Sequence, residues 1–343
     1  MSQQAANSDG PAQEGTTMNR RNALKYLGGG VLAASGARVG YEVTGYGTVS
    51  GTNVTEQELG PLAREHLRAT PFDLSVRDGQ LRFDGKVLAF DNRAETRASV
   101  AVQETTPDAA AAEGEKYGVD APFRELTADI QDLGAGDVTF EFSSNEAFFD
   151  RIEQATPRPF TVAALRGDSF GAPDPETLEA FAGSGPENPA ALVAGLATGF
   201  RDHAHFDVER WIVFNVEDHV LLNTLPIGEY VSEHTGFEEL ADGSTGLYCW
   251  EDARRSLAAL HAAPPHNQSP PVFGAVVTDD RHNHMYTGFA SAIRDGQELV
   301  LPMTFADYSH STMYDSYGLR WALGSGIDAY STQHRATEIR YTW

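Results

Sequence analysis

The sequence predicts an α+β protein, with a small α+β module followed by a larger region in which helices pack on antiparallel strands. Residues 81–90 alternate apolar and polar side chains around Asp84-Gly85, which indicates a β-hairpin. Residues 192–200 carry apolar side chains at helical spacing, and residues 272–305 contain apolar runs of strand length. The 343 residues, of which 41% are hydrophobic, are enough for a folded core, and no internal repeat is visible.

The charge composition excludes some classes of partner. The chain has 49 acidic and 25 basic residues, a net charge of −24, so we expect neither nucleic acid nor an anionic membrane surface to bind. Three of the basic residues are lysines (Lys25, Lys86 and Lys116), and the other 22 are arginines. This acidic, lysine-poor composition resembles that of proteins from extreme halophiles. Surface carboxylates repel one another, and concentrated salt screens this repulsion, so we expect the protein to need high salt.

The N-terminal segment predicts export. Arg20-Arg21 and Lys25 precede a small-residue, mildly apolar stretch at 26–37, so residues 1–37 resemble a twin-arginine signal and imply an extracellular location. Residues 38–60 are rich in Gly, Thr and Ser, which indicates a linker. No apolar run is long enough to span a membrane.

Residues 61–170 predict a small α+β module of binding or structural purpose. After the hairpin, residues 99–103 can extend the sheet, and residues 106–115, rich in Ala, Asp and Pro, predict a loop. Residues 137–142 alternate as a strand, and residues 145–154 predict a helix. The module has no histidine after His66, so it shows no recognisable chemistry.

Residues 171–343 predict a second domain that carries the chemistry. Ten of the eleven histidines lie between His203 and His334. Asn188-Pro189 predicts the start of a helix, with Asn as the cap and proline in the first turn. A further apolar segment covers residues 211–225.

Cys249 is the only cysteine, so no intramolecular disulfide can form. A Gly-rich turn precedes it, and the apolar spacing of Ala253, Leu257 and Leu260 predicts a helix that begins at Cys249. The positive end of a helix favours thiolate, which is the nucleophilic form of cysteine. Glu251 and Asp252 oppose this effect, so a basic partner is needed.

The spacing of two strand candidates suggests that partner. One strand runs from near His284 to Ile293, Asp295-Gly296 predicts a two-residue turn, and a second strand follows from Glu298. If Arg294 faces Gln297, the same register places His284 opposite Asp307. Pro302 lies inside the second strand, which predicts an edge strand or a bulge there.

At these residues, over about 205–310, the sequence resembles the transglutaminase-like superfamily of cysteine enzymes, which have the papain-like fold. The resemblance implies that Cys249 is the nucleophile, His284 the general base and Asp307 the group that orients the imidazole. It implies attack on a peptide or other amide, with the backbone N–H of Cys249 as one oxyanion donor, followed by hydrolysis or acyl transfer. No cofactor is needed for this chemistry.

Other interpretations stay open. Cys249 could be a buried, inert thiol in a secreted binding or surface protein with a degenerate fold of this type, and Asp315 is the reserve candidate for the acid. The pairs His203/His205 and His282/His284 could instead bind zinc or copper, with Asp202, Asp207 or Asp280 as a third ligand. The sequence leaves the oligomeric state and the substrate's identity open.

Overall fold

The computed structural model describes residues 57–167, 171–207, 236–241, 246–280, 284–309 and 335–341, and the single residues Arg210, Val213 and Gly243. All of these except Arg210 and Val213 belong to one compact unit, to which the following description refers. The predicted export signal, nearly all of the linker, the segment 211–225 apart from Val213, and His282 and Asp315 lie outside the described residues.

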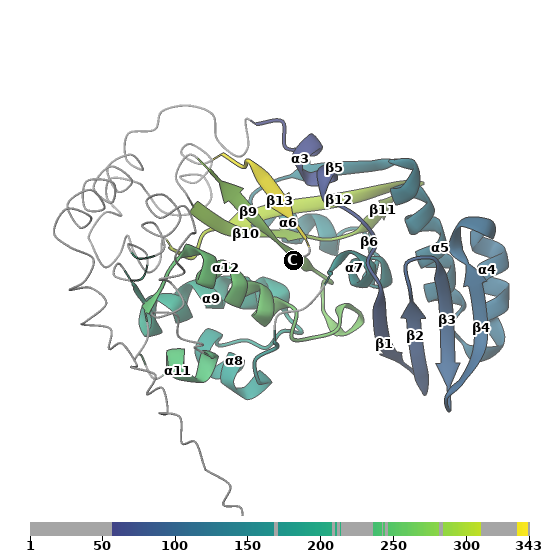
Figure 1. Ribbon diagram of the computed structural model, residues 1–343, viewed down its shortest axis with the longest axis horizontal. Coiled ribbons are helices and arrows are strands. Elements are labelled where there is room, and N and C mark those ends of the chain that lie inside the picture. The colour runs from purple at the N-terminus through teal and green to yellow at the C-terminus, as the bar shows by residue number, and fades with distance from the viewer. Residues whose placement is uncertain are drawn as a thin grey trace, which may run out of the picture. The chain divides into compact units, whose positions relative to one another are not determined.

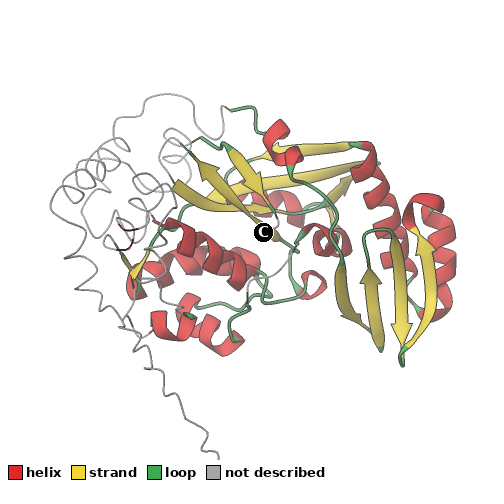
Figure 2. Ribbon diagram, viewed as in Figure 1, coloured by secondary structure: helices red, strands yellow, loops and turns green. Residues whose placement is uncertain are grey.

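The unit has an α+β architecture (Figures 1 and 2). The strands are β1 Phe72–Val76, β2 Gly79–Phe83, β3 Val87–Asn92, β4 Glu95–Ala101, β5 Val138–Phe142, β6 Thr156–Pro157, β7 His205–Phe206, β8 Gly246–Leu247, β9 Phe273–Asp279, β10 His284–Ala290, β11 Ile293–Asp295, β12 Glu298–Ala306 and β13 Glu338–Arg340. The α-helices are α3 Gly60–Glu65, α4 Pro107–Gly114, α5 Asp120–Ala135, α6 Asn145–Glu153, α7 Pro159–Leu165, α8 Pro175–Ala182, α9 Pro189–His203, α11 Phe237–Ala241 and α12 Cys249–Leu260.

Strands β1 to β4 form an antiparallel sheet in sequence order. The predicted hairpin is confirmed: β2 pairs with β3, and Gly85 has the positive φ of 97° that glycine adopts most easily. The prediction of a loop at 106–115 is wrong, because α4 begins there. Thr106 caps this helix by accepting a hydrogen bond from the N–H of Ala109, and Pro107 occupies the first turn. The helix packs against α5 and buries Ala110 and Ala111.

The larger sheet has the order β13-β9-β10-β12-β11-β6, and β5 lies parallel to β12. Strands β5 and β6 come from the first half of the chain, so this sheet crosses the boundary that the sequence suggests at residue 170. The predicted strand at 137–142 and the predicted helix at 145–154 are both present, as β5 and α6. The cap of α9 is also confirmed, because the Asn188 side chain accepts a hydrogen bond from the N–H of Ala191.

Helices cover both faces of the larger sheet (Figure 2). On one face, Leu299, Leu301 and Met303 of β12 belong to a core that includes residues of α3 and α7. On the other face, Val300 joins a second core, formed with residues of α6, α8, α9, α11 and α12. The alternation of odd and even positions along β12 between the two cores is the two-residue period of a strand that is buried on both sides.

Helix α12 lies close against β9 and β10. A Cβ added at Gly274 of β9 would clash with Cδ2 of Leu257, so a larger residue there would force the Leu257 side chain of α12 to move. A buried hydrogen bond of 2.7 Å joins Ser256 Oγ of α12 to Thr287 Oγ1 of β10. These contacts fix the helix that begins at Cys249 against the strand that begins at His284.

The predicted hairpin register is wrong by two residues. Asp295 pairs with Glu298 and Thr287 with Ala306, so the two turn residues are Gly296 and Gln297. Pro302 lies in an interior strand without a bulge, because the register is the same on both sides of it. The neighbouring strand is interrupted instead: β10 ends at Ala290, and the N–H of Ser291 donates to the carbonyl of Pro302.

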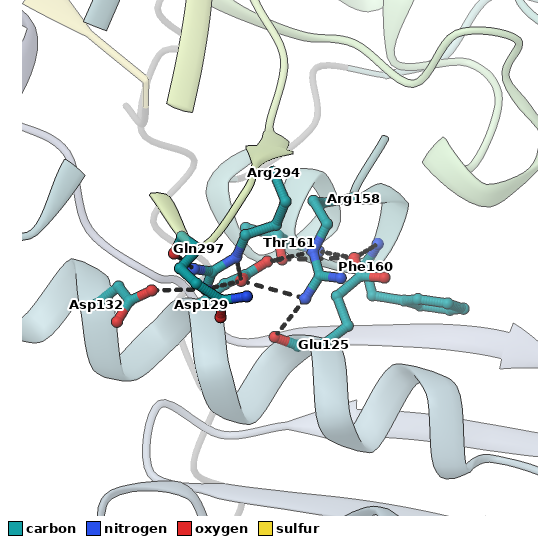
Figure 3. A network of polar contacts seen from close by, with 8 residues as sticks. All are labelled: Glu125, Asp129, Asp132, Arg158, Phe160, Thr161, Arg294 and Gln297. Carbon is teal, nitrogen blue, oxygen red and sulfur yellow. Dashed lines mark hydrogen bonds and ion pairs between the residues drawn. The ribbon is translucent and has the colours of Figure 1, made fainter. Parts of the chain in front are cut away.

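A charged network joins α5, α7 and β11 (Figure 3). Glu125, Asp129 and Asp132 share one face of α5. Fully buried Asp129 binds Arg158 and Arg294. Glu125 accepts hydrogen bonds from the backbone N–H groups of Phe160 and Thr161 at the start of α7. These contacts tie the helix beside the small sheet to the large sheet.

Among the residues that the structure describes, no helix is long and apolar enough to cross a membrane.

Candidate active site

Cys249 is the first residue of α12, as the sequence predicts. The preceding segment, β8, pairs in parallel with β7, and the N–H of Asp207 donates to the carbonyl of Leu247. A Cβ added at Gly246 would lie 2.6 Å from Cβ of Asp207, so the turn before the cysteine packs tightly. Cys249 therefore lies at the positive end of the helix dipole, which favours negative charge on the sulfur. Cys249 is 6% exposed.

His284 is the first residue of β10 and is 5% exposed. Its Nε2 lies 3.0 Å from Oδ2 of Asp307, the residue that follows β12. The imidazole also forms a hydrogen bond with the side chain of Cys249. Since Nε2 is engaged by Asp307, Nδ1 is the ring nitrogen left for the thiol. The structure therefore brings together Cys249, His284 and Asp307.

The His–Asp contact forms even though the predicted register does not hold. Continuing the observed register past its last pair puts Asp307 opposite Tyr286, which makes it a diagonal neighbour of His284. A shift of two residues leaves each side chain on the same side of the sheet, whereas a shift of one would reverse it. Diagonal neighbours are within reach of long side chains. The predicted contact between His284 and Asp307 therefore forms, although the predicted register is wrong by two residues.

The charge state of the imidazole follows from its partners. Burial by itself would lower the pKa of His284. The Asp307 carboxylate outweighs this penalty through its charge and its hydrogen bond, and Cys249 adds to the effect, so the pKa is raised well above its usual value. A cationic imidazole beside the sulfur stabilises negative charge on it.

The turn after β12 holds Asp307 through its second carboxylate oxygen. The backbone N–H of Ser309 donates to Oδ1 of Asp307 at 2.9 Å, while Oδ2 contacts the imidazole. The Ser309 hydroxyl donates to Oδ2 of Asp252 at 3.3 Å. Sequence reasoning missed Ser309, although a serine two residues after a candidate acid is a residue type that bonds locally to backbone and carboxylate.

Asp252 does not oppose the thiolate in the way that the sequence suggests. Its side chain is buried, and burial raises its pKa well above the usual value. The negative charges of Asp307 and Glu251 raise this pKa further, while the hydrogen bond from Ser309 and the charge of Arg255 act in the opposite direction. Burial therefore favours the uncharged form of Asp252, and this form carries no negative charge that would repel a thiolate.

The alternative metal site is not assembled by the described residues. His203 ends α9 and His205 lies in β7, so the two do not alternate along one strand. Within the described ranges, no group of three or more His, Cys, Asp or Glu side chains could hold a metal ion. His282 lies outside these ranges.

Comparison with known proteins gives no family: no protein-family model, curated protein or solved structure matches the chain.

Proposed function

We propose that the chain is an exported cysteine hydrolase of the transglutaminase-like type, with a papain-like fold, that acts on peptide or other amide bonds. The observation that carries this proposal is the double engagement of His284, which contacts the Cys249 side chain and the Asp307 carboxylate in one buried cluster. A buried imidazole between a sulfur and a carboxylate is the arrangement that activates a cysteine nucleophile.

The proposed reaction has two steps. The Cys249 thiolate attacks the amide carbonyl carbon, and the oxyanion that forms accepts a hydrogen bond from the backbone N–H of Cys249. The C–N bond then breaks, and the His284 imidazolium gives its proton to the leaving amine. Water, deprotonated by His284, attacks the thioester, which releases the carboxylic acid and returns the thiol. An amine in place of water would give acyl transfer.

Asp307 has a positioning and electrostatic role in this scheme. Its contact with Nε2 holds the ring beside Cys249, and its charge stabilises the imidazolium. The carboxylate itself is held by the backbone N–H of Ser309. The chemistry requires no metal or cofactor, because the nucleophile, the base and the acid come from side chains.

The test begins with the thiol, because the substrate is unidentified. In concentrated KCl, we expect iodoacetamide to alkylate Cys249 at pH 7 far faster than it alkylates free cysteine, and His284→Ala to abolish this difference. With amide or peptide substrates that the wild type cleaves, Cys249→Ala is expected to lower kcat by at least about 1,000-fold. His66→Ala is the matched control, since His66 also contacts a carboxylate, that of Glu338 at 2.8 Å.

Three results would count against the proposed enzyme. A thiol that alkylates no faster than free cysteine would indicate an inert residue in a binding or surface protein. Cleavage that is unchanged in Cys249→Ala would assign the activity to other residues. Metal that copurifies with protein prepared without chelators would favour the histidine site instead.

A further inference from the structure

Asp252 is a buried carboxyl group that the proposed reaction does not use. It lies one helical turn after Cys249, on the same side of α12. Its side chain is 1% exposed. Oδ2 accepts the hydrogen bond from the Ser309 hydroxyl, whereas Oδ1 has no hydrogen-bond partner within the described part of the chain. Burying a carboxyl group with so few partners is costly, so a structural role alone explains it poorly.

The position of Ser309 connects this carboxyl group to the site. The Ser309 hydroxyl binds Asp252, and its backbone N–H binds Oδ1 of Asp307. The other oxygen of Asp307 contacts His284. A continuous chain of hydrogen bonds therefore runs from the first turn of α12, through the turn after β12, to the imidazole.

We propose that Asp252 is a positioning residue of the site: through the Ser309 hydroxyl, it anchors the turn that carries Asp307 and so keeps this carboxylate against His284. The proposal rests on the function proposed above. In this proposal, α12 carries both the nucleophile, Cys249, and the residue that anchors the acid, Asp252. Nucleophile and acid then keep a fixed distance although they lie on different elements.

The charge of Asp252 matters for this role. The charged groups that act on it are Asp307 from the turn after β12, and Glu251 and Arg255 from its own helix. In the uncharged form that burial favours, Asp252 accepts the Ser309 hydrogen bond without adding a second negative charge beside Asp307. An ionised Asp252 would repel Asp307 and attract the imidazolium, which would loosen the geometry.

The experiment compares Asp252→Asn, Asp252→Ala, Ser309→Ala and the control Glu251→Gln, each in concentrated KCl. Asn keeps an acceptor oxygen for Ser309 without charge, whereas Ala removes it. Ser309→Ala removes the hydroxyl but keeps the backbone N–H, so it tests the same link in a variant that changes only one buried oxygen. Glu251→Gln removes a neighbouring negative charge without touching Ser309. The readouts are the alkylation rate of Cys249 against pH and the titration of the His284 ring by NMR.

We expect Asp252→Ala and Ser309→Ala to slow alkylation at pH 7 by 10-fold or more, up to roughly the 100-fold that a misplaced group can cost. Both should lower the pKa of His284 toward its usual value, because Asp307 is released. Asp252→Asn should resemble the wild type. Glu251→Gln should not slow alkylation, because it removes a negative charge that opposes the thiolate and leaves the Asp252–Ser309 hydrogen bond in place. If Asp252 and Ser309 had only a structural role, the variants would change the melting temperature but would leave the pKa of His284 unchanged.

Failure of this inference and failure of the proposed function give different results. If wild-type Cys249 reacts no faster than free cysteine, the proposed function is wrong whatever the variants do. If the wild type reacts fast, but folded Ser309→Ala keeps its rate and its His284 titration, the function stands and Asp252 is not a positioning residue. Should Asp252→Ala not fold, Ser309→Ala decides the question.

Discussion

Replacing Glu125 with Gln tests whether a buried carboxyl group makes the fold sensitive to pH. Glu125 lies on α5, in the network that joins this helix to α7 and β11 (Figure 3). Burial raises its pKa from 4.5 to about 7. The charge of Arg158 and the hydrogen bonds from the backbone of Phe160 and Thr161 lower the pKa, but they offset only part of the desolvation, and the charge of Asp129 raises it further.

The sign and size of the effect follow from linkage. A folded-state pKa above the unfolded one means that the folded protein binds this proton more tightly, so the stabilisation is complete below pH 4.5 and is lost as the pH rises to about 7. Each pH unit in this interval changes the free energy of unfolding by about 1.4 kcal/mol, which gives about 3 kcal/mol in total. Gln imitates the protonated form and keeps the oxygen that accepts from Phe160 and Thr161.

The assay is urea unfolding of wild type and Glu125→Gln in concentrated KCl, at pH values on both sides of this interval. We expect the variant to gain about 3 kcal/mol relative to the wild type between pH 4.5 and pH 8. Glu113→Gln, at an exposed position of α4, is the control and should show no such trend. A difference between wild type and Glu125→Gln that stays constant across this range would refute the reasoning, because a fixed cost of the amide does not depend on pH.

Two further predictions concern the core and the surface. Gly274→Ala should destabilise the fold by about 1–3 kcal/mol and slow the alkylation of Cys249, because the added methyl group displaces Leu257 and with it α12. The measurements are the melting temperature and the alkylation rate. Gly171→Ala is the control, because a Cβ added there meets nothing within 4 Å. With a net charge of −24, the protein should lose its compact structure as KCl falls below about molar concentration, since screening weakens; a circular dichroism signal that stays flat down to ~0.01 M would contradict this.

Local signals identified many of the elements. The alternation around Asp84-Gly85, the cap and proline at Asn188-Pro189, and the apolar spacing after Cys249 each depend on residues close in sequence, and each is present in the structure. The helix at 107–114 was missed for a local reason as well. The Thr106 cap and Pro107 form a helix start that depends only on neighbouring residues, and the prediction of a loop from the Ala, Asp and Pro content does not take it into account.

The register of the hairpin needed more than local information. The turn is shifted by one residue along the chain, from Asp295-Gly296 to Gly296-Gln297, which changes the register by two. Pro302 has pairing strands on both sides, and the missing donor is accommodated by the break at Ser291 in the neighbouring strand. Neither feature follows from residue preferences alone, because both depend on how the partner strand pairs and where it is interrupted.

The sequence by itself determined that a lone cysteine begins a helix, and it supplied one histidine and one aspartate at strand ends as candidate partners. Those features come from periodicity and turn chemistry, which act over a few residues. Only the tertiary structure decided that α12 lies against β9 and β10, that His284 contacts Cys249 and Asp307, and that Asp252 is buried beside them. Burial and charge depend on side chains far apart in the sequence, and desolvation raises the pKa of the Asp252 carboxyl group, which favours its uncharged form.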